Sequence, residues 1–402
     1  MLVNEFQMDI DLLKNPIFAD ALTEIESLGF HVSESASPGS VKYGIISGRS
    51  NQRWWLVPLV NRSVTTNGLA IFQPITTSAK LFKRAALMAT LSGQSGLWAR
   101  QTLFISGGSR LMEIFKNRNL HFSFFTGTDS PHRKAAVQVM DVSGQIKGFV
   151  KVSRKPSVKS LLIHEAATLH FLRSLDLKTV HIPRVLFSGE SDGVNIFVTD
   201  SLKTSQTKTS VVVNKAHLAF LHELASRTAI PDKSDSDTLI TELGRRYSLV
   251  ARRLPLNWKR RLERGIEHAA AYKTAVGSQV LSHGDFTPWN SFFVNGKLYV
   301  FDWEYAEQVY PSGYDLIHFV ISSQRITNAS NPSQAIKQVF KQVAAMMHPV
   351  DSQQTMRLLL TYLCGHALRS FYREPDDDDE VVSCASAEEI ADILDTATEW
   401  KL

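Results

Sequence analysis

The chain has 402 residues, of which 44% are hydrophobic and 21% charged, an ordinary composition for a globular protein of two or three domains. Its 44 Lys and Arg against 39 Asp and Glu give a formal net charge of +5, which favours anionic partners such as nucleotides or an acidic membrane surface. No long basic block interleaved with aromatic residues is present, so we expect no nucleic-acid partner.

Targeting signals are weak in this sequence. The N-terminus MLVNEFQMDIDLLKN carries acids where a signal peptide needs basic residues, and no run of about 18 apolar residues predicts a transmembrane segment. The 2 cysteines provide neither a disulfide framework nor a CxxC zinc pattern. We therefore expect a cytoplasmic protein.

Residues 1–108 form the first of three expected regions, an extra α/β region. A helix is expected over 12–29, and a basic helix over 78–92. The basic helix either docks on its own domain with a solvated basic rim or makes a peripheral membrane contact. Trp54 and Trp55 are adjacent, so strand alternation places them on opposite faces. That favours core packing; the alternative is a substrate- or partner-binding addition.

The sequence of residues 109–202 predicts a small lobe built on an antiparallel sheet. Three successive strands are expected between 119 and 153, joined by short polar turns, and a helix follows over 157–175. Two more strand candidates, RVLFSG and NIFVTDSL, complete the lobe. Five strands with one helix inserted after the third predict an α+β arrangement.

Residues 203–402 predict a mainly helical lobe with several amphipathic segments. The last helix has a capping-box pattern, Ser386 with Glu389. An acidic run at 375–380, PDDDDE, precedes it and is interpreted as a solvated loop, although near a site it would favour a cationic substrate.

Polar residues cluster in LSHGDFTPWNSFF at 281–293 and again in VFDWEYA at 300–306. Carboxylates are rarely buried without a partner, so this cluster is a candidate site. Phosphoryl transfer needs a group that orients the acceptor hydroxyl and oxygen ligands for Mg²⁺. Asp285 is the candidate base, Asn290 and Asp302 offer oxygen ligands, and His283 is expected to orient the loop through hydrogen bonds.

The pattern HGDFTPWN, followed by FDWE with its aspartate 17 positions after Asp285, resembles the signature of the aminoglycoside phosphotransferase and choline kinase family. The resemblance implies a bilobal, protein-kinase-like α+β fold that uses ATP and Mg²⁺. It implies that Asp285 is the catalytic aspartate and that Asn290 and Asp302 are the metal ligands. Asp315, in SGYDLIHF, matches a family aspartate that supports the catalytic loop.

The same resemblance gives meaning to the lobe upstream. Lys151 ends the third strand, where kinase-like folds keep a phosphate-binding lysine, and Glu165 on the next helix is placed to pair with it. Backbone groups around Thr199, Asp200 and Leu202 fall where a hinge would hold the adenine.

One turn departs from the kinase pattern. The turn FFTGTDSPHRKA has one glycine instead of a GxGxxG loop, so Thr128, Ser130 and backbone amides are the candidates for phosphate contact, with Arg133 or Lys134 as an added cation. This departure bears on nucleotide choice more than on the fold.

The leading interpretation is an ATP- and Mg²⁺-dependent kinase that phosphorylates a hydroxyl of a small molecule. A sugar or glycan-related acceptor is favoured, because the large N-terminal region indicates a dedicated substrate or assembly role. The acidic run favours instead an aminoglycoside, choline or another amino alcohol. A non-catalytic nucleotide-binding scaffold and a nucleotidyl-transferring enzyme are the remaining alternatives.

Overall fold

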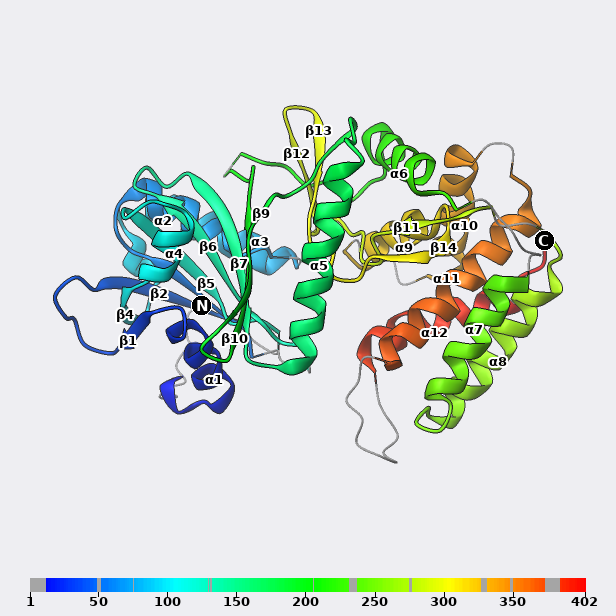
Figure 1. Ribbon diagram of the computed structural model, residues 1–402, viewed down its shortest axis with the longest axis horizontal. Helices are drawn as coiled ribbons and strands as arrows, with labels where there is room; N and C mark the ends of the chain where they lie inside the picture. Colours follow the sequence, from blue (N-terminus) through cyan, green and yellow to red (C-terminus); the bar gives the residue numbers. More distant parts are fainter. Residues whose placement is uncertain are drawn as a thin grey trace, which may run out of the picture. The chain divides into compact units, whose positions relative to one another are not determined.

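The computed structural model describes residues 12–48, 52–74, 76–128, 130, 132–204, 206–230, 237–274, 277–326, 331–347, 350–372 and 384–402. The chain forms two compact units (Figure 1). The first unit comprises Met1–His170 and Pro183–Thr207, and the second comprises Phe171–Ile182 and Lys208–Leu402.

The first unit is built on a nine-stranded sheet in which each described neighbouring pair is antiparallel. Its strands lie in the order β1-β4-β2-β3-β5-β6-β7-β10-β9. They span Phe30–Ser33 (β1), Val41–Ser47 (β2), Trp54–Pro58 (β3), Gln101–Gly107 (β4), Leu120–Phe125 (β5), Ala135–Asp141 (β6), Ile146–Ser153 (β7), Val185–Ser191 (β9) and Val194–Asp200 (β10).

The five strands expected between residues 119 and 202 are all present as one half of this sheet. The expected boundary at residue 108 falls inside the unit, because β3 pairs with β5 through Trp55 with Phe125 and Leu56 with Phe124. The N-terminal strands therefore extend the small lobe's own sheet instead of forming a separate domain.

The two faces of the sheet carry two different hydrophobic clusters, which the alternation of side chains along each strand separates. Trp54 packs edge-on against Phe18 on one face, with ring centroids 5.1 Å apart. Trp55 stacks on Phe125 at 5.1 Å on the other face, where Phe72 also contacts it. The expected placement of the two tryptophans on opposite faces is confirmed, and both have core-packing roles.

Several helices of the first unit pack on these faces. In α1, Asn15 caps the N-terminus by accepting the N–H groups of Ile17 and Phe18, and Pro16 occupies the first turn. The remaining helices and 3-10 turns are Leu12–Lys14 (η1), Arg62–Gly68 (α2), Leu69–Ile71 (η2), Thr77–Leu91 (α3), Ser95–Leu97 (η3), Ser109–Ile114 (α4) and Pro156–Ser174 (α5), with α1 itself at Pro16–Glu26.

The basic helix expected over 78–92 is α3. It docks on the sheet through Ala86 and Thr90, and Thr90 accepts a hydrogen bond from the Trp98 indole N–H. Leu81 and Met88 stay 57% and 66% exposed. Within the described part of the chain, no helix has both the length and the apolar character needed to cross a membrane. Contact of α3 with a membrane surface stays a prediction.

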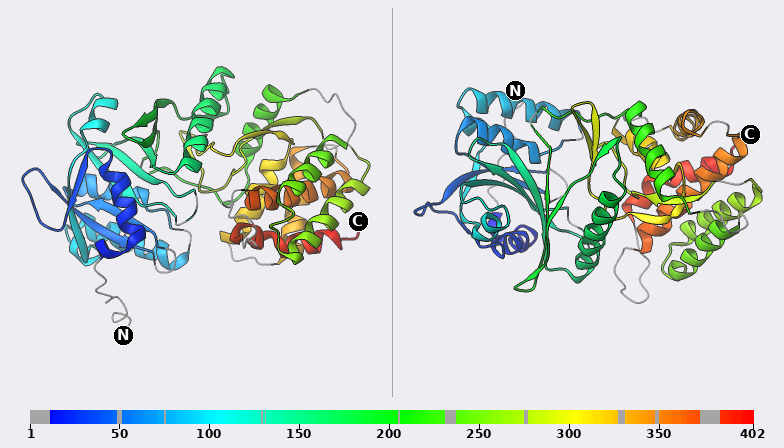
Figure 2. Two further views of the ribbon diagram at one scale, coloured as in Figure 1. Left: turned by 60° about the horizontal axis from the view of Figure 1, so that its bottom comes forward. Right: turned by 45° about the horizontal axis from the view of Figure 1, so that its top comes forward.

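The second unit is mainly helical, and the long helix α11 lies against α7, α8 and α12 (Figure 2). Its helices are Lys215–Thr228 (α6), Asp237–Val250 (α7), Leu256–Ala271 (α8), Tyr314–Ile326 (α9), Pro332–Met346 (α10), Ser352–Tyr372 (α11) and Ala385–Thr398 (α12). Its strands are Val180–His181 (β8), Gln279–Ser282 (β11), Ser291–Val294 (β12), Lys297–Val300 (β13) and Glu307–Pro311 (β14).

Two small sheets hold the polar residues of this unit in place. Strands β12 and β13 form a hairpin, with β8 parallel to β13, and β11 pairs with β14. The two strand-like runs that flank the polar cluster are therefore both strands, but they belong to different sheets.

The expected capping box in the last helix is wrong. The N-cap of helix α12 lies two residues earlier than expected, at Cys384, and makes no side-chain capping bond. Ser386 and Glu389 instead lie inside the first turns of the helix, where their side chains line a cavity together with residues of α9 and α11. The acidic run at 375–380 lies outside the described residues.

Candidate functional site

Asp315, in the first turn of α9, holds the loop between β11 and β12 in place. Its buried carboxylate accepts the backbone N–H of His283 at 2.6 Å and that of Gly284 at 3.0 Å. Gly284 has φ +80°, and a Cβ there would collide with the carbonyl oxygen of Tyr305. A glycine is therefore required at this turn.

His283 connects the loop to the segment after β13. Its Nδ1 accepts the N–H of Asp285 at 3.2 Å, so its Nε2 carries the proton and donates to the carbonyl oxygen of Phe301 at 2.9 Å. Burial lowers the pKa of the imidazole, against the opposing effect of the nearby carboxylates. A neutral, hydrogen-bonded His283 fits the orienting role expected for it.

Both oxygens of the Asp285 carboxylate are held. Asn290 Nδ2 donates to Oδ2 at 2.8 Å and also to the Asp285 backbone oxygen at 3.0 Å, and His318 Nε2 lies 3.0 Å from Oδ1. Burial raises the pKa of this carboxyl, but the hydrogen bond from His318 and the nearby positive groups outweigh burial and lower it. Asp285 is thus an ionised carboxylate of fixed orientation at neutral pH.

The β12–β13 hairpin places Asp302 next to Asn290 in the fold. Ser291 pairs with Val300, and the N–H of Phe301 donates to the backbone oxygen of Asn290 at 3.1 Å. Asp302 has φ +70°, a left-handed conformation that costs energy for a residue other than glycine. Such strain is concentrated at functional sites, where the surrounding structure enforces it.

The donor set around Asn290 fits a hard divalent cation. Because Asn290 Nδ2 donates twice to Asp285, the amide oxygen is on the other side of the group and is available as a ligand. An amide oxygen and the Asp302 carboxylate are the ligand types that Mg²⁺ prefers, with nucleotide phosphates and water completing its coordination.

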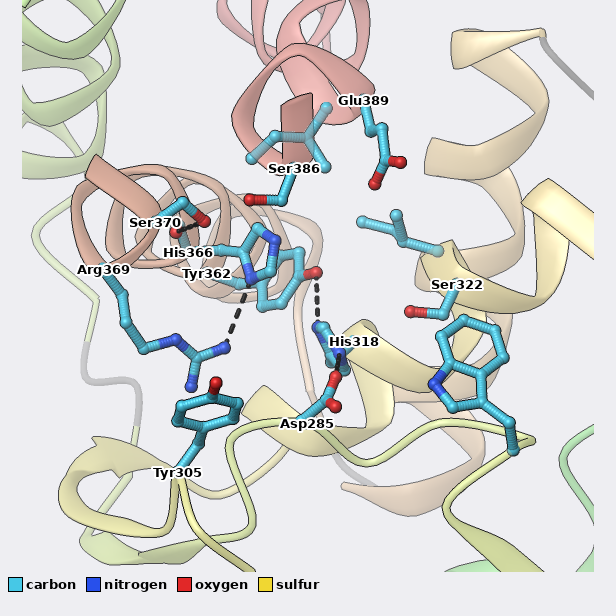
Figure 3. A pocket seen from close by; sticks show the side chains of 13 residues that line it. Asp285, Tyr305, His318, Ser322, Tyr362, His366, Arg369, Ser370, Ser386 and Glu389 are labelled. Atoms are coloured by element: carbon cyan, nitrogen blue, oxygen red, sulfur yellow. Dashed lines mark hydrogen bonds and ion pairs between the residues drawn. The ribbon is translucent and has the colours of Figure 1, made fainter. Parts of the chain in front are cut away.

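A cavity of about 160 Å³ opens beside Asp285, between the loop and helices α9, α11 and α12 (Figure 3). Ser386 and Glu389 of α12 lie across the cavity from Asp285, and the Arg369 guanidinium lies over the ring of Tyr305. The other lining residues are Trp289, His318, Ile321, Ser322, Tyr362, His366, Ser370 and Ile390. The cavity is polar, with aromatic and hydroxyl-bearing walls.

Lys151 and Glu165 form an ion pair within the first unit. Lys151 lies on β7 and Glu165 on α5, and the ammonium and carboxylate are 2.5 Å apart, with the Glu165 side chain only 3% exposed. The expected pairing of strand lysine with helix glutamate is therefore present. A lysine held in this way has a fixed direction, which a phosphate-binding role requires.

The other residues expected to contact nucleotide lie at and after the end of β10 and in the loop after β5. Thr199 and Asp200 end β10, where Asp200 accepts the N–H of Arg184 at 2.7 Å, and the Leu202 side chain is 45% exposed. Thr128 and Ser130 are half-buried in the loop after β5, and the Ser130 carbonyl accepts the Lys155 ammonium at 3.0 Å.

Arg133 is not placed for phosphate binding. Its buried guanidinium pairs with Asp20 of α1 and donates to the carbonyl oxygen of Ile17. These contacts occupy it on the N-terminal helix, so the added cation expected from this arginine is absent at that position. Phosphate contact by Lys134 stays a prediction.

Sequence reasoning missed the groups that approach Asp285 from the helices. His318 lies three residues after Asp315 in YDLIHF, and Arg369 Nη2 donates to the carbonyl oxygen of Gly284 from α11. The spacing of Tyr362, His366 and Arg369 along one helix was the available signal. It could not be interpreted without knowing which face of α11 meets the loop.

Comparison with solved structures finds distant similarity. A thermostable mutant of aminoglycoside phosphotransferase APH(4)-Ia shares 13% identity at TM-score 0.47, over 72% of this chain and 97% of that one. A putative fructosamine-3-kinase from Thermobifida fusca YX-ER1 shares 17% at TM-score 0.45, over 72% and 96%. The APH(2")-IIIa enzyme in complex with GDP and kanamycin shares 14% at TM-score 0.44, over 72% and 97%.

No curated protein matches the sequence. A family model described as "Phosphotransferase enzyme family" matches residues 134–339, just over half of the chain. The match contains Lys151, Glu165, Asp285, Asn290 and Asp302, whereas the N-terminal strands and helices α11 and α12 lie outside it. The resemblance carried by HGDFTPWN and FDWE is confirmed, and the chain belongs to the phosphotransferase enzyme family, as an enzyme of the kinase class.

Proposed function

We propose that the protein transfers the terminal phosphoryl group of ATP, with Mg²⁺, to a hydroxyl of a small molecule that binds in the cavity beside Asp285. The observation that supports this most strongly is the fixed Asp285 carboxylate at the wall of a polar cavity. Phosphoryl transfer depends mainly on positioning and electrostatics, and such a carboxylate supplies the positioning of the acceptor.

Asp285 would accept a hydrogen bond from the attacking hydroxyl and orient its oxygen. Since its pKa is lowered, it is ionised throughout the neutral range and needs no activation. Asn290 and Asp302 would hold Mg²⁺, which when bound neutralises charge on the phosphates. His283 and Asp315 would keep the loop in the conformation that presents Asp285.

Residues of the first unit would bind the nucleotide. Lys151, held by Glu165, would contact the phosphates, as would Thr128 and Ser130 through hydroxyl and backbone groups. Backbone groups at Thr199, Asp200 and Leu202 would hold the adenine, with the exposed Leu202 side chain at its edge. The nucleotide assignment rests on this set of residues and on family membership.

A sugar or glycan-related acceptor fits the cavity best. Its hydroxyl-bearing wall (Ser322, Ser370 and Ser386) suits the hydrogen bonding of a polyol, and Trp289 and Tyr305 offer apolar ring surface. Glu389 and Asp285 are the carboxylates among the described lining residues, and the Arg369 cation offsets one of them. A molecule with several ammonium groups would find little compensation in this part of the site.

An aminoglycoside, choline or another amino alcohol is the second candidate acceptor. Glu389, which faces Asp285 across the cavity, would then pair with one ammonium group of the acceptor. A non-catalytic nucleotide-binding scaffold is the third candidate, against which the complete set of Asp285, Asn290 and Asp302 argues.

The test is an acceptor screen with radiolabelled ATP, sugars and glycan fragments first and amino alcohols and aminoglycosides second. Asp285→Asn should lose turnover with every acceptor, while the exposed Asp392→Asn on α12 serves as the matched control. The mass of the product separates phosphoryl from nucleotidyl transfer. Equal turnover in Asp285→Asn and wild type would contradict the proposed function, and function retained without turnover would favour the scaffold.

A further inference from the structure

A buried histidine and a buried tyrosine form a chain of contacts that ends on Asp285. His318, on α9, has Nε2 3.0 Å from Asp285 Oδ1 and Nδ1 2.9 Å from the hydroxyl of Tyr362, on α11 (Figure 3). His318 is 4% exposed and Tyr362 is 1% exposed. Tyr362 of α11 thus reaches Asp285 Oδ1 through His318 of α9.

The chemistry of the three side chains determines where the hydrogens lie between Asp285, His318 and Tyr362. An ionised carboxylate only accepts hydrogen bonds, so His318 Nε2 must carry a proton and donate it to Oδ1. In the neutral ring Nδ1 then accepts, and the Tyr362 hydroxyl is the donor beside it. The Tyr362 hydroxyl therefore holds the His318 ring in the orientation that points Nε2 at Asp285.

The two oxygens of Asp285 are restrained by different elements. Asn290 holds Oδ2 from within the loop, and His318 holds Oδ1 from α9. With Asn290 alone, the carboxylate could still rotate about its Cβ–Cγ bond, whereas two donors at two oxygens fix its plane. Misplacement of a reacting group by about 1 Å costs about 10²-fold in rate.

We propose that His318 is a positioning residue for the reaction, which fixes the plane of the Asp285 carboxylate toward the acceptor hydroxyl, and that Tyr362 holds the His318 ring in the orientation in which it does so. This inference rests on the proposed function, because it gives Asp285 the role of orienting that hydroxyl. Neither the HGDFTPWN nor the FDWE motif contains these residues.

The charged groups around His318 come from each helix that packs near it. His366 lies with its ring centroid 5.2 Å from that of His318, Arg369 contacts His366 at 3.3 Å, and Glu389 lines the same cavity from α12. A merely structural His318 would fill space between α9 and α11. Its loss would then lower stability without acting through Asp285.

The experiment is a double-mutant cycle on phosphate release from Mg·ATP, with water as the acceptor. His318→Leu should lower the rate constant for release about 10- to 100-fold with an unchanged KM for ATP, since it removes the donor to Oδ1. In Asp285→Asn the same change should cost less than about 3-fold, because a positioning residue has nothing left to position. Equal costs in both backgrounds would overturn the proposal.

Two conservative variants keep the test decisive if His318→Leu folds poorly. His318→Gln retains an N–H donor near the position of Nε2 and should recover the rate to within about 5-fold of wild type. Tyr362→Phe should lower it about 3- to 10-fold, because the His318 ring loses the hydrogen bond that orients it. A His318→Gln variant as slow as His318→Leu, or an unchanged Tyr362→Phe, would contradict the assignment.

Failure of the proposed function gives a different result. If neither this release nor turnover in the acceptor screen depends on Asp285, the proposed function fails, and this inference fails with it. If release depends on Asp285 but not on His318, only this inference fails.

Discussion

Removing the Asp315 carboxylate should uncouple the loop between β11 and β12 from α9. In Asp315→Ala the N–H groups of His283 and Gly284 lose the acceptor that they now share, at 2.6 and 3.0 Å, in a buried setting. A buried donor left unsatisfied costs about 1–3 kcal/mol, so two such donors predict a loss of about 4 kcal/mol. For a unit of this size that corresponds to a fall in Tm of about 8–16 °C.

Asp315→Asn refines the same prediction. The amide keeps one oxygen acceptor but turns an NH2 group toward the second backbone N–H, so about half of the loss should remain. Thermal unfolding followed by circular dichroism measures both variants, with the exposed Asp392→Asn as the control, which should stay within about 0.5 kcal/mol of wild type. An Asp315→Ala protein that unfolds within about 2 °C of the control would refute this account of the loop.

Other substitutions test separate parts of the structure. Lys151→Ala and Glu165→Gln should each raise the KM for ATP about 10-fold or more with little change in Tm, measured by steady-state kinetics; an unchanged KM would remove the phosphate-binding assignment. Gly284→Ala should lower Tm by several degrees and abolish turnover, because the new methyl group collides with the Tyr305 carbonyl; near-wild-type behaviour would show that the turn relaxes easily. Burial lowers the pKa of His217 to about 4, below its value near 6.5 in the unfolded chain. Because the unfolded state therefore binds more protons, the free energy of unfolding should fall by up to about 3 kcal/mol as the pH drops from 6.5 to 4. His217→Gln should flatten that part of the stability–pH curve in denaturant titrations, and an unchanged slope would assign it to other groups.

Much of the site was predictable because its chemistry is local in sequence. His283, Asp285 and Asn290 lie within one loop, and a short hairpin returns the chain to Asp302, so spacing alone brings these groups together. The pairing of Lys151 with Glu165 was expected from the family resemblance, which places such a lysine on a strand and its glutamate on the next helix. Turns and adjacent elements have few alternative arrangements, which is why such patterns are informative.

The parts that escaped prediction depend on long-range packing. The N-terminal region was expected to be separate, but its strand β3 pairs with β5 across 70 residues of sequence, a register that no local pattern encodes. His318 contacts Asp285 and Tyr362 contacts His318 only because α9 and α11 pack on one another in one rotational setting. The motif at Ser386 and Glu389 was misread as a helix cap because both roles use the same residue types.

The measurement that tests the central claim most directly is thermal stability with and without Mg·ATP, in the wild type and in Asp302→Asn. Ligand at about 100 times its dissociation constant adds about 2.7 kcal/mol to the folded state, which is visible as a shift of several degrees. The account predicts a magnesium-dependent rise in the wild type that is lost in Asp302→Asn, with the Tm of the free variant near that of the free wild type. An equal rise in both proteins, or none in the wild type, would contradict the assignment of a nucleotide- and magnesium-dependent kinase.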